Sequence, residues 1–172
     1  MKEDEWAHID IGNQIDNSWN KDTALALKLN KVTFSIKIRE TDKKEIEKKY
    51  IKQANSRKDF KEKRKVIVLL YSFLLFKLLN ESNGICKKVK VCNDVSPAND
   101  VYRYLNKICK YYNVKPLEQR MKIRFKKKGD GESKAHGVAN RVFKGRKPAD
   151  YLIKSKDIED FNNIVREILH LG

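Results

Sequence analysis

A run of apolar residues from Val66 to Leu79, broken only by Ser72 and Lys77, sets the first limit on the fold. The run is apolar nearly all round a helix, which is typical of a helix buried against other elements. It is shorter than the roughly 20 residues that a membrane-spanning helix needs. It therefore predicts a helix packed against a sheet and speaks against a membrane span at this place.

Three segments before this run have the patterns of β-strands. Ala7 to Ile11 is a short apolar segment closed by Gly12. A polar loop over residues 13–22 carries Asp16 and Asp22. The segments 23–29 and 32–38 then alternate around Asn30-Lys31, which suits a tight hairpin turn. In the later segment we expect one face to meet the core and one to meet water; the first holds Val32, Phe34, Ile36 and Ile38, and the second holds Thr33, Ser35, Lys37 and Arg39.

The later segments predict further helices and strands. Residues 40–65 are charged and predict a surface helix or a mobile arm, while 89–92 and 121–125 predict strands. Ser96 and Pro97 predict the start of a helix, with the serine as N-cap and the proline as first helical residue. Apolar periodicity predicts buried helix faces formed by Val101, Tyr104, Leu105 and Ile108, and by Ile158, Phe161, Val165, Ile168 and Leu169, with a short helix near 133–142 between them.

These elements predict one α/β domain over residues 1–172, with 40–65 as a charged insertion. A strand–helix–strand connection makes the two flanking strands parallel, whereas the first three strands form an antiparallel meander. The sheet should therefore be mixed and flanked by helices.

The charge balance indicates a polyanionic partner. The 172 residues carry a net charge of +16, which favours nucleic acid or an anionic membrane, although a merely solvated surface is the alternative. The acidic N-terminus has no apolar region behind it, so it is not a signal peptide and we expect a cytoplasmic protein. The cysteines Cys86, Cys92 and Cys109 lack a C-x-x-C spacing, and we expect Cys92 and Cys109 to be small core residues.

Two acids stand in or at the end of predicted strands. Asp10 lies inside the apolar segment 7–12, where a buried and unpaired carboxylate is costly. Asp94 stands where the strand 89–92 stops. Two such strands around a buried helix point to a metal-dependent nuclease site in a basic protein. Alternatively, Asp10 accepts hydrogen bonds at a sheet edge, and Asp94 assists Ser96 in capping a helix.

The segment Ile9-Asp10-Ile11-Gly12, the hairpin, the buried helix and the strand ending at Asp94 together resemble the ribonuclease H-like superfamily. That group contains ribonucleases H, transposases, retroviral-type integrases and Holliday-junction resolvases. The resemblance spans roughly Ala7 to Tyr151 and implies a ribonuclease H-like mixed sheet. It also implies that Asp10 and Asp94 lie side by side and hold Mg²⁺ or Mn²⁺.

The superfamily uses a further acid from a later helix, and here the sequence departs from the pattern. His136 and Asn140 stand where resolvases tend to carry an Asp, while Ala149-Asp150 resembles an Ala-Asp pair of ribonucleases H. The resemblance thus implies Asp150 as a third metal ligand and catalytic residue, and His136 as a proton shuttle or phosphate contact. From the residues alone, Asp150 could equally cap a helix and His136 could be a satisfied surface histidine. The buried helix lacks an internal Glu of the ribonuclease H type, for which Glu81 is a poor substitute.

A basic run flanks this motif, and we expect it to contact phosphates and to carry little sequence information. Its cations are Lys126, Lys127, Lys128, Lys134, Arg141, Lys144, Arg146 and Lys147.

The function that these observations predict is a divalent-metal-dependent nuclease acting on nucleic-acid phosphodiesters, with no membrane partner. The alternative is a non-catalytic nucleic-acid-binding protein with the same fold and a degraded site. Many junction-cutting relatives work as dimers, so a homodimer is one option. The turn Asp10-Ile11-Gly12 also fits actin-like or sugar-kinase-type enzymes, but these need two such halves and the chain has room for one.

Overall fold

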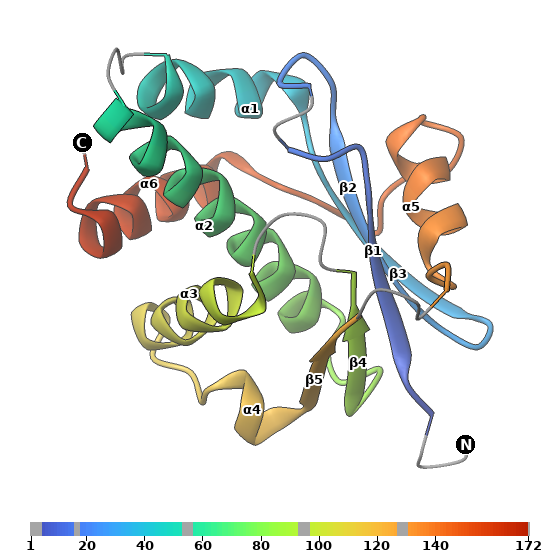
Figure 1. The fold of residues 1–172 in the computed structure, drawn as a ribbon. Helices are drawn as coiled ribbons and strands as arrows, with labels where there is room; N and C mark the ends of the chain where they lie inside the picture. Colours follow the sequence, from blue (N-terminus) through green and yellow to red (C-terminus); the bar gives the residue numbers. More distant parts are fainter. Residues whose placement is uncertain (1–4, 16–17, 53–56, 93–96, 127–130, 172) are drawn as a thin grey trace.

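A computed structural model describes residues 5–15, 18–52, 57–92, 97–126 and 131–171. This part of the chain forms a six-stranded sheet with helices on both faces (Figure 1). The strands are β1 (Ala7–Gly12), β2 (Thr23–Leu29), β3 (Val32–Ile38), β4 (Lys88–Val91), β5 (Lys122–Phe125) and β6 (Tyr151–Leu152). The helices are α1 (Glu40–Ile46), the π-helical turn η1 (Glu47–Ile51), α2 (Arg57–Glu81), α3 (Ala98–Tyr111), α4 (Leu117–Arg120), α5 (His136–Phe143) and α6 (Ser155–Leu169).

The sheet has the strand order β5-β4-β1-β2-β3-β6. β1, β2 and β3 form the predicted antiparallel meander, while β4, β5 and β6 add in parallel to β1, β4 and β3. The prediction of an α/β fold with a mixed sheet is therefore confirmed. β6 was not predicted, because a strand of two residues leaves no alternation in the sequence.

Helix α2 confirms the predicted buried helix. Every residue from Val66 to Leu79 is buried, and the helix contacts β2, β3, α3 and α6. It begins at Arg57, inside the charged segment 40–65, whose described residues are otherwise helical as α1 and η1. The charge of this segment is thus compatible with helices that lie at the edge of the core, where Ile46 is buried.

The start of α3 differs from the prediction by one residue. Pro97 occupies the N-cap position with extended backbone angles (φ −52°, ψ 134°), and the helix begins at Ala98. Pro97 is therefore not the first helical residue, and Ser96 lies outside the described residues. The predicted buried face of this helix is confirmed, since Val101, Tyr104, Leu105 and Ile108 are all buried.

Helix α5 lies on the opposite face of the sheet from α2 and packs over β1, β2 and β3 (Figure 1). A Cβ atom on Gly12 would lie 2.5 Å from the carbonyl oxygen of Ala139, so the glycine permits this close approach. Ala26 of β2 completes the contact with Val138 and Ala139. Small residues on this face of the sheet therefore bring α5 close to β1.

The expectation for β3 is wrong at two positions. Val32, expected to meet the core, is exposed at the start of the strand. Ser35 was assigned to the face that meets water, yet it is fully buried. Ser35 is buried by tertiary contacts, because α5 packs over β3 and the carboxylate of Asp150 accepts hydrogen bonds from the backbone N–H and the hydroxyl of Ser35.

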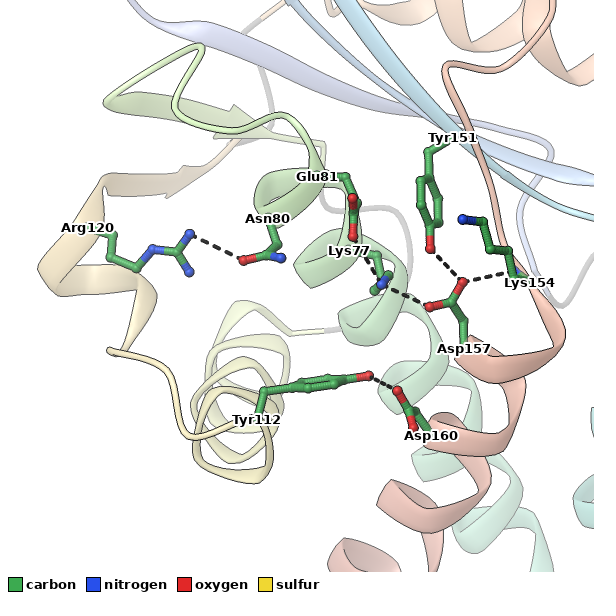
Figure 2. A network of polar contacts seen from close by, with 9 residues as sticks. All are labelled: Lys77, Asn80, Glu81, Tyr112, Arg120, Tyr151, Lys154, Asp157 and Asp160. Carbon is green, nitrogen blue, oxygen red and sulfur yellow. Dashed lines mark hydrogen bonds and ion pairs between the residues drawn. The ribbon is translucent and has the colours of Figure 1, made fainter.

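A buried polar network joins α2 to α6 (Figure 2). Lys77, which interrupts the apolar run in the sequence, lies 2.9 Å from Asp157 and 3.2 Å from Glu81. Asp157 also accepts hydrogen bonds of 2.8 Å from the hydroxyl of Tyr151 and from the backbone N–H of Lys154. The network thus fixes the start of α6 and the start of β6 against the central helix.

The cysteines lie in or close to the core. Cys86 and Cys109 are buried, Cys92 is half-buried, and within the described residues none of the three is in a disulfide. Burial raises the pKa of Cys86 to about 11 and also raises the pKa of Cys109, as befits core residues.

Within the described residues, no helix is both long enough and apolar enough to cross a membrane.

Candidate functional site

Asp10 lies in β1 with its side chain on the face covered by α5. Ile9 and Ile11, its neighbours along the strand, belong to the main core. Because successive side chains of a strand point to opposite faces, the side chain of Asp10 points away from that core. Across the sheet Asp10 pairs with Ala26, and Ala26 pairs with Ser35. The carboxylate is buried, with an exposed fraction of only 5% for the residue.

Asp10 contacts His136 of α5, and His136 in turn contacts Asn140 of the same helix. One carboxylate oxygen accepts a 2.8 Å hydrogen bond from the backbone N–H of Ile11, and the other lies 3.2 Å from Nδ1 of His136. Nε2 of His136 lies 2.8 Å from the side-chain nitrogen of Asn140. His136 and Asn140 are one helical turn apart and therefore face the same way.

The contacts of His136 select one tautomer. A carboxylate only accepts hydrogen bonds, so Nδ1 carries the hydrogen toward Asp10. The amide nitrogen of Asn140 only donates, so Nε2 accepts with its lone pair. This assignment follows from the hydrogen-bond network, in which the imidazole is held at both nitrogens.

These residues border a polar hollow with a volume of about 440 Å³. Its lining comes from β1, the loop after it, the end of β4 and the approach to α5; it comprises Asp10, Ile11, Asn13, Gln14, Cys92, Lys126, Gly131, Glu132, Ser133, His136 and Asn140. Glu132 lies 3.8 Å from Nε2 of His136, and Lys126 donates a hydrogen bond to the carbonyl of Gly131. The hollow thus combines a buried acid, a histidine and a cation, a set that can bind an anionic group and move a proton.

Asp94 lies outside the described residues, but the strand before it leads toward Asp10. β4 is the parallel neighbour of β1, with Val91 paired to Ile9. The backbone N–H of Cys92 donates a 3.0 Å hydrogen bond to the carbonyl of Ile9. Asp94 follows two residues later in the sequence. The pairing of Asp10 with Asp94 stays a prediction.

The structure does not bring Asp150 to Asp10. The Asp150 carboxylate is bound by the backbone N–H and hydroxyl of Ser35, both at 2.8 Å. Ser35 is two strands away from Asp10, which is about 10 Å at the usual strand spacing. Asp150 therefore fastens the chain entering β6 to β3, and the described contacts give it no place beside Asp10.

The predicted basic run divides in the structure. Lys126 lines the hollow, whereas Lys127 and Lys128 lie outside the described residues. Lys134 is exposed at the approach to α5, and Lys147 donates a 2.9 Å hydrogen bond to the hydroxyl of Thr33. The remaining cations, Arg141, Lys144 and Arg146, are exposed on α5 or directly after it.

Sequence reasoning missed a second set of cations, which lies in the strands. Lys88 and Lys90 alternate with apolar residues in β4, and Lys122 and Arg124 do so in β5. This alternation is visible in the sequence, but it does not show which face of the sheet the helices leave uncovered.

The donor set for a metal is incomplete within the described residues. No group of three or more histidine, cysteine, aspartate or glutamate side chains in that part of the chain could hold a metal ion. Asp10 supplies one carboxylate, a hard oxygen ligand of the kind that Mg²⁺ prefers, and Mg²⁺ commonly takes one or two carboxylates together with water and phosphate. Asp10 therefore fits a partly hydrated metal site that includes a second acid.

Comparison with known proteins returned no match to a family model, to a curated protein or to a solved structure. The fold is therefore described as an α/β fold with a six-stranded mixed sheet, and the functional argument rests on the chemistry around Asp10.

Proposed function

We propose that the protein binds nucleic acid and hydrolyses its phosphodiester bonds with a divalent metal ion held at Asp10. The observation that carries this proposal is the unusual state of that carboxylate. It is buried on a central strand and borders a polar hollow, and among the described residues no lysine or arginine pairs with it. Because a buried carboxylate favours a cation beside it, a metal ion from solution would stabilise the site.

The arrangement of strands supports a ribonuclease H-like version of this proposal. The resemblance places one acid on the first strand and a second at the end of the fourth, side by side. Here β4 is the direct parallel neighbour of β1, and the crossover between the meander and β4 runs through the buried helix α2. We therefore keep Asp94 as the second ligand of the proposed metal.

The residues around Asp10 have separate tasks in the proposed reaction. A bound Mg²⁺ or Mn²⁺ would activate water and stabilise the leaving oxygen of the phosphodiester. Asp10 and Asn140 hold His136 in the tautomer with its lone pair on Nε2. Once the Asn140 amide releases this nitrogen, it can accept a proton from water or a hydrogen bond from the substrate. Lys126 at the rim can bind a phosphate oxygen through a charge-assisted hydrogen bond.

A cleavage panel tests the proposal. Hybrids, junctions, duplexes and single strands are incubated with Mg²⁺ or Mn²⁺, and the wild type is compared with Asp10→Asn and Asp94→Asn. We expect both variants to lose about 100-fold or more in rate, as for removal of a metal ligand or its support. The matched control is Asp100→Asn, since this aspartate forms an exposed ion pair with Arg103 on α3 and should leave the rate unchanged.

The outcomes separate the proposal from its alternative. Failure to bind either metal in calorimetry, or an Asp10→Asn variant as active as the wild type, would contradict the nuclease proposal. Nucleic-acid binding without cleavage under any of these conditions would favour the non-catalytic protein with a degraded site.

A further inference from the structure

One face of β4 and β5 carries cations at every second position. The register pairs Lys88 with Lys122 and Lys90 with Arg124, so the four cations stand in two rows across the two strands. Of the residues that alternate with them, Val89, Val91 and Phe125 are buried in the core, and Ile123 is half-buried against it. We call the surface formed by Lys88, Lys90, Lys122 and Arg124 the basic face.

The basic face belongs to the same side of the sheet as Asp10. Lys90 pairs with His8 of β1, and His8 pairs with Lys28 of β2. His8 and Asp10 are two residues apart and therefore share a face. The row that runs from Arg124 through Lys90 and His8 to Lys28 thus lies directly beside the row that contains Asp10.

Helix α5 contacts β1, β2 and β3, while β4 and β5 extend away from it (Figure 1). Directly after β5, Lys126 follows Arg124 by two residues and lines the hollow at Asp10. The cations therefore continue without a break from the outer part of the basic face to the candidate active site.

The cations act together on the histidine between them. Burial lowers the pKa of His8, and the charges of Lys134, Lys90 and Lys126 lower it further. The surface also offers an aromatic ring, because Nζ of Lys90 lies 5.8 Å from the centre of the Trp6 ring. A positive surface with an aromatic ring is the usual combination for binding single-stranded nucleic acid.

We propose that the basic face binds the phosphate backbone of a single nucleic-acid strand and leads it to Asp10. The direction toward Asp10 rests on the proposed function, whereas binding to the face does not. Successive cations on one strand are about 6.6 Å apart, twice the rise per residue, so they form a regular row along an extended backbone. Contacts of this kind fix the position of a strand and carry no direct sequence information.

A membrane surface fits the face less well than a nucleic acid does. Binding at a membrane interface usually combines cations with apolar side chains that enter the lipid. The large apolar residues that are exposed in the described part of the chain are Val32, Phe60, Val114 and Leu152, and none of them lies on β4 or β5.

The test is an anisotropy titration of a labelled single-stranded oligonucleotide in EDTA, where cleavage cannot interfere. The variant Lys90→Glu/Lys122→Glu reverses two charges of the basic face. The matched control, Lys107→Glu/Lys110→Glu, makes the same charge change at exposed positions of α3. We expect the first variant to bind about 10-fold or more weaker than the control, and its plot of log Kd against log salt to lose about 1.4 in slope, for two lost phosphate contacts on a single strand.

Equal weakening of both variants would overturn the proposal, because it would show an effect of net charge alone. A basic-face variant that keeps its oligonucleotide affinity but no longer binds phosphatidylserine vesicles would also overturn it, in favour of a membrane. If the glutamate variant does not fold by circular dichroism, Lys90→Gln/Lys122→Gln is titrated against Lys107→Gln/Lys110→Gln with the same criteria. An Asp10→Asn protein that still binds the oligonucleotide through the basic face would support this inference whether or not the cleavage proposal survives.

Discussion

Asp10 and Asp157 are equally buried, each with an exposed fraction of 5%, but their surroundings differ. Asp157 is fully engaged by the ammonium group of Lys77, the hydroxyl of Tyr151 and the backbone N–H of Lys154 (Figure 2). Asp10 receives one backbone N–H and one histidine nitrogen, and it borders a hollow. One carboxylate has a buried cation and a complete set of donors, whereas the other has neither among the residues that the structure describes.

The difference separates a structural carboxylate from a functional one. A buried acid that has a cation and several donors contributes to the fold, and removing it leaves its partners unpaired. A buried acid with few donors beside a hollow costs stability, and proteins keep such groups where they bind or react. By this criterion Asp157 belongs to the fold and Asp10 to the site.

The largest expected effect is a contrast in stability between Asp157→Asn and Asp10→Asn. The first change leaves Lys77 buried beside a neutral amide, and we expect it to lower the free energy of unfolding by about 3 kcal/mol. The second change removes a charge that no lysine or arginine among the described residues pairs with, so we expect the free energy of unfolding to stay the same or rise. Urea denaturation without metal, followed by circular dichroism, measures both.

A loss of stability in Asp10→Asn as large as that in Asp157→Asn would break the comparison, since Asp10 would then be a structural residue. The variant Glu159→Gln serves as control, because Glu159 is exposed and pairs with the exposed Lys156 on α6.

The next effect concerns the close contact that holds His136 beside Asp10. In Gly12→Ala, the new Cβ would meet the backbone of Ala139 at 2.5 Å, so α5 must move away from β1. We expect a loss of about 1–3 kcal/mol, as for other overpacked sites, together with loss of the contact between His136 and Asp10. Denaturation measures the stability, and the imidazole signals of His136 in NMR spectra report the contact.

Gly137→Ala is the matched control on α5 itself. A Cβ atom at Gly137 meets nothing within 4 Å, and alanine favours a helix over glycine by about 1 kcal/mol. This variant should therefore be slightly more stable than the wild type. If Gly12→Ala were equally harmless, the position of α5 over Asp10 would be wrong.

The sequence was most informative where local pattern decides the structure. β2 and β3 have the predicted bounds, because their residues alternate around Asn30, which adopts the left-handed conformation (φ 55°) that suits a tight turn. The apolar pattern of residues 66–79 correctly predicted that this part of α2 is buried. Local pattern also placed Asp10 in a strand, and the sheet order shows that this strand is an inner one.

The partners of these residues could not be predicted in the same way. The contact between Asp10 and His136 joins positions far apart in the chain and depends on the close packing of α5 over Gly12 and Ala26. The resemblance of Ala149-Asp150 to an Ala-Asp pair of ribonucleases H favoured Asp150 as a ligand, but the structure places this residue at Ser35. Lys77 interrupts an apolar run in the sequence, and only the fold shows the buried acid that pairs with it.

The smallest expected effect is the pH dependence of the difference in free energy of unfolding between the wild type and Asp157→Asn. Burial alone raises the pKa of Asp157, but the N–H of Lys154, the ammonium of Lys77 and the hydroxyl of Tyr151 together hold this pKa below its ordinary value of 3.8. An acid with a lowered pKa stabilises the fold fully above its unfolded pKa and loses this contribution as pH falls through the folded pKa.

The stability gap between the wild type and Asp157→Asn should therefore be constant from pH 7 to about 5 and narrow below about pH 4. Lys77 does not change its charge over this range: burial opposes the charged form, yet the bonds to Asp157 and Glu81 raise the pKa of Lys77 above its ordinary value. Urea denaturation of both proteins at pH 7, 5, 4 and 3 measures the gap. A gap that keeps its full size at pH 3 would mean that the ionised carboxylate is not the group that holds α6 to α2.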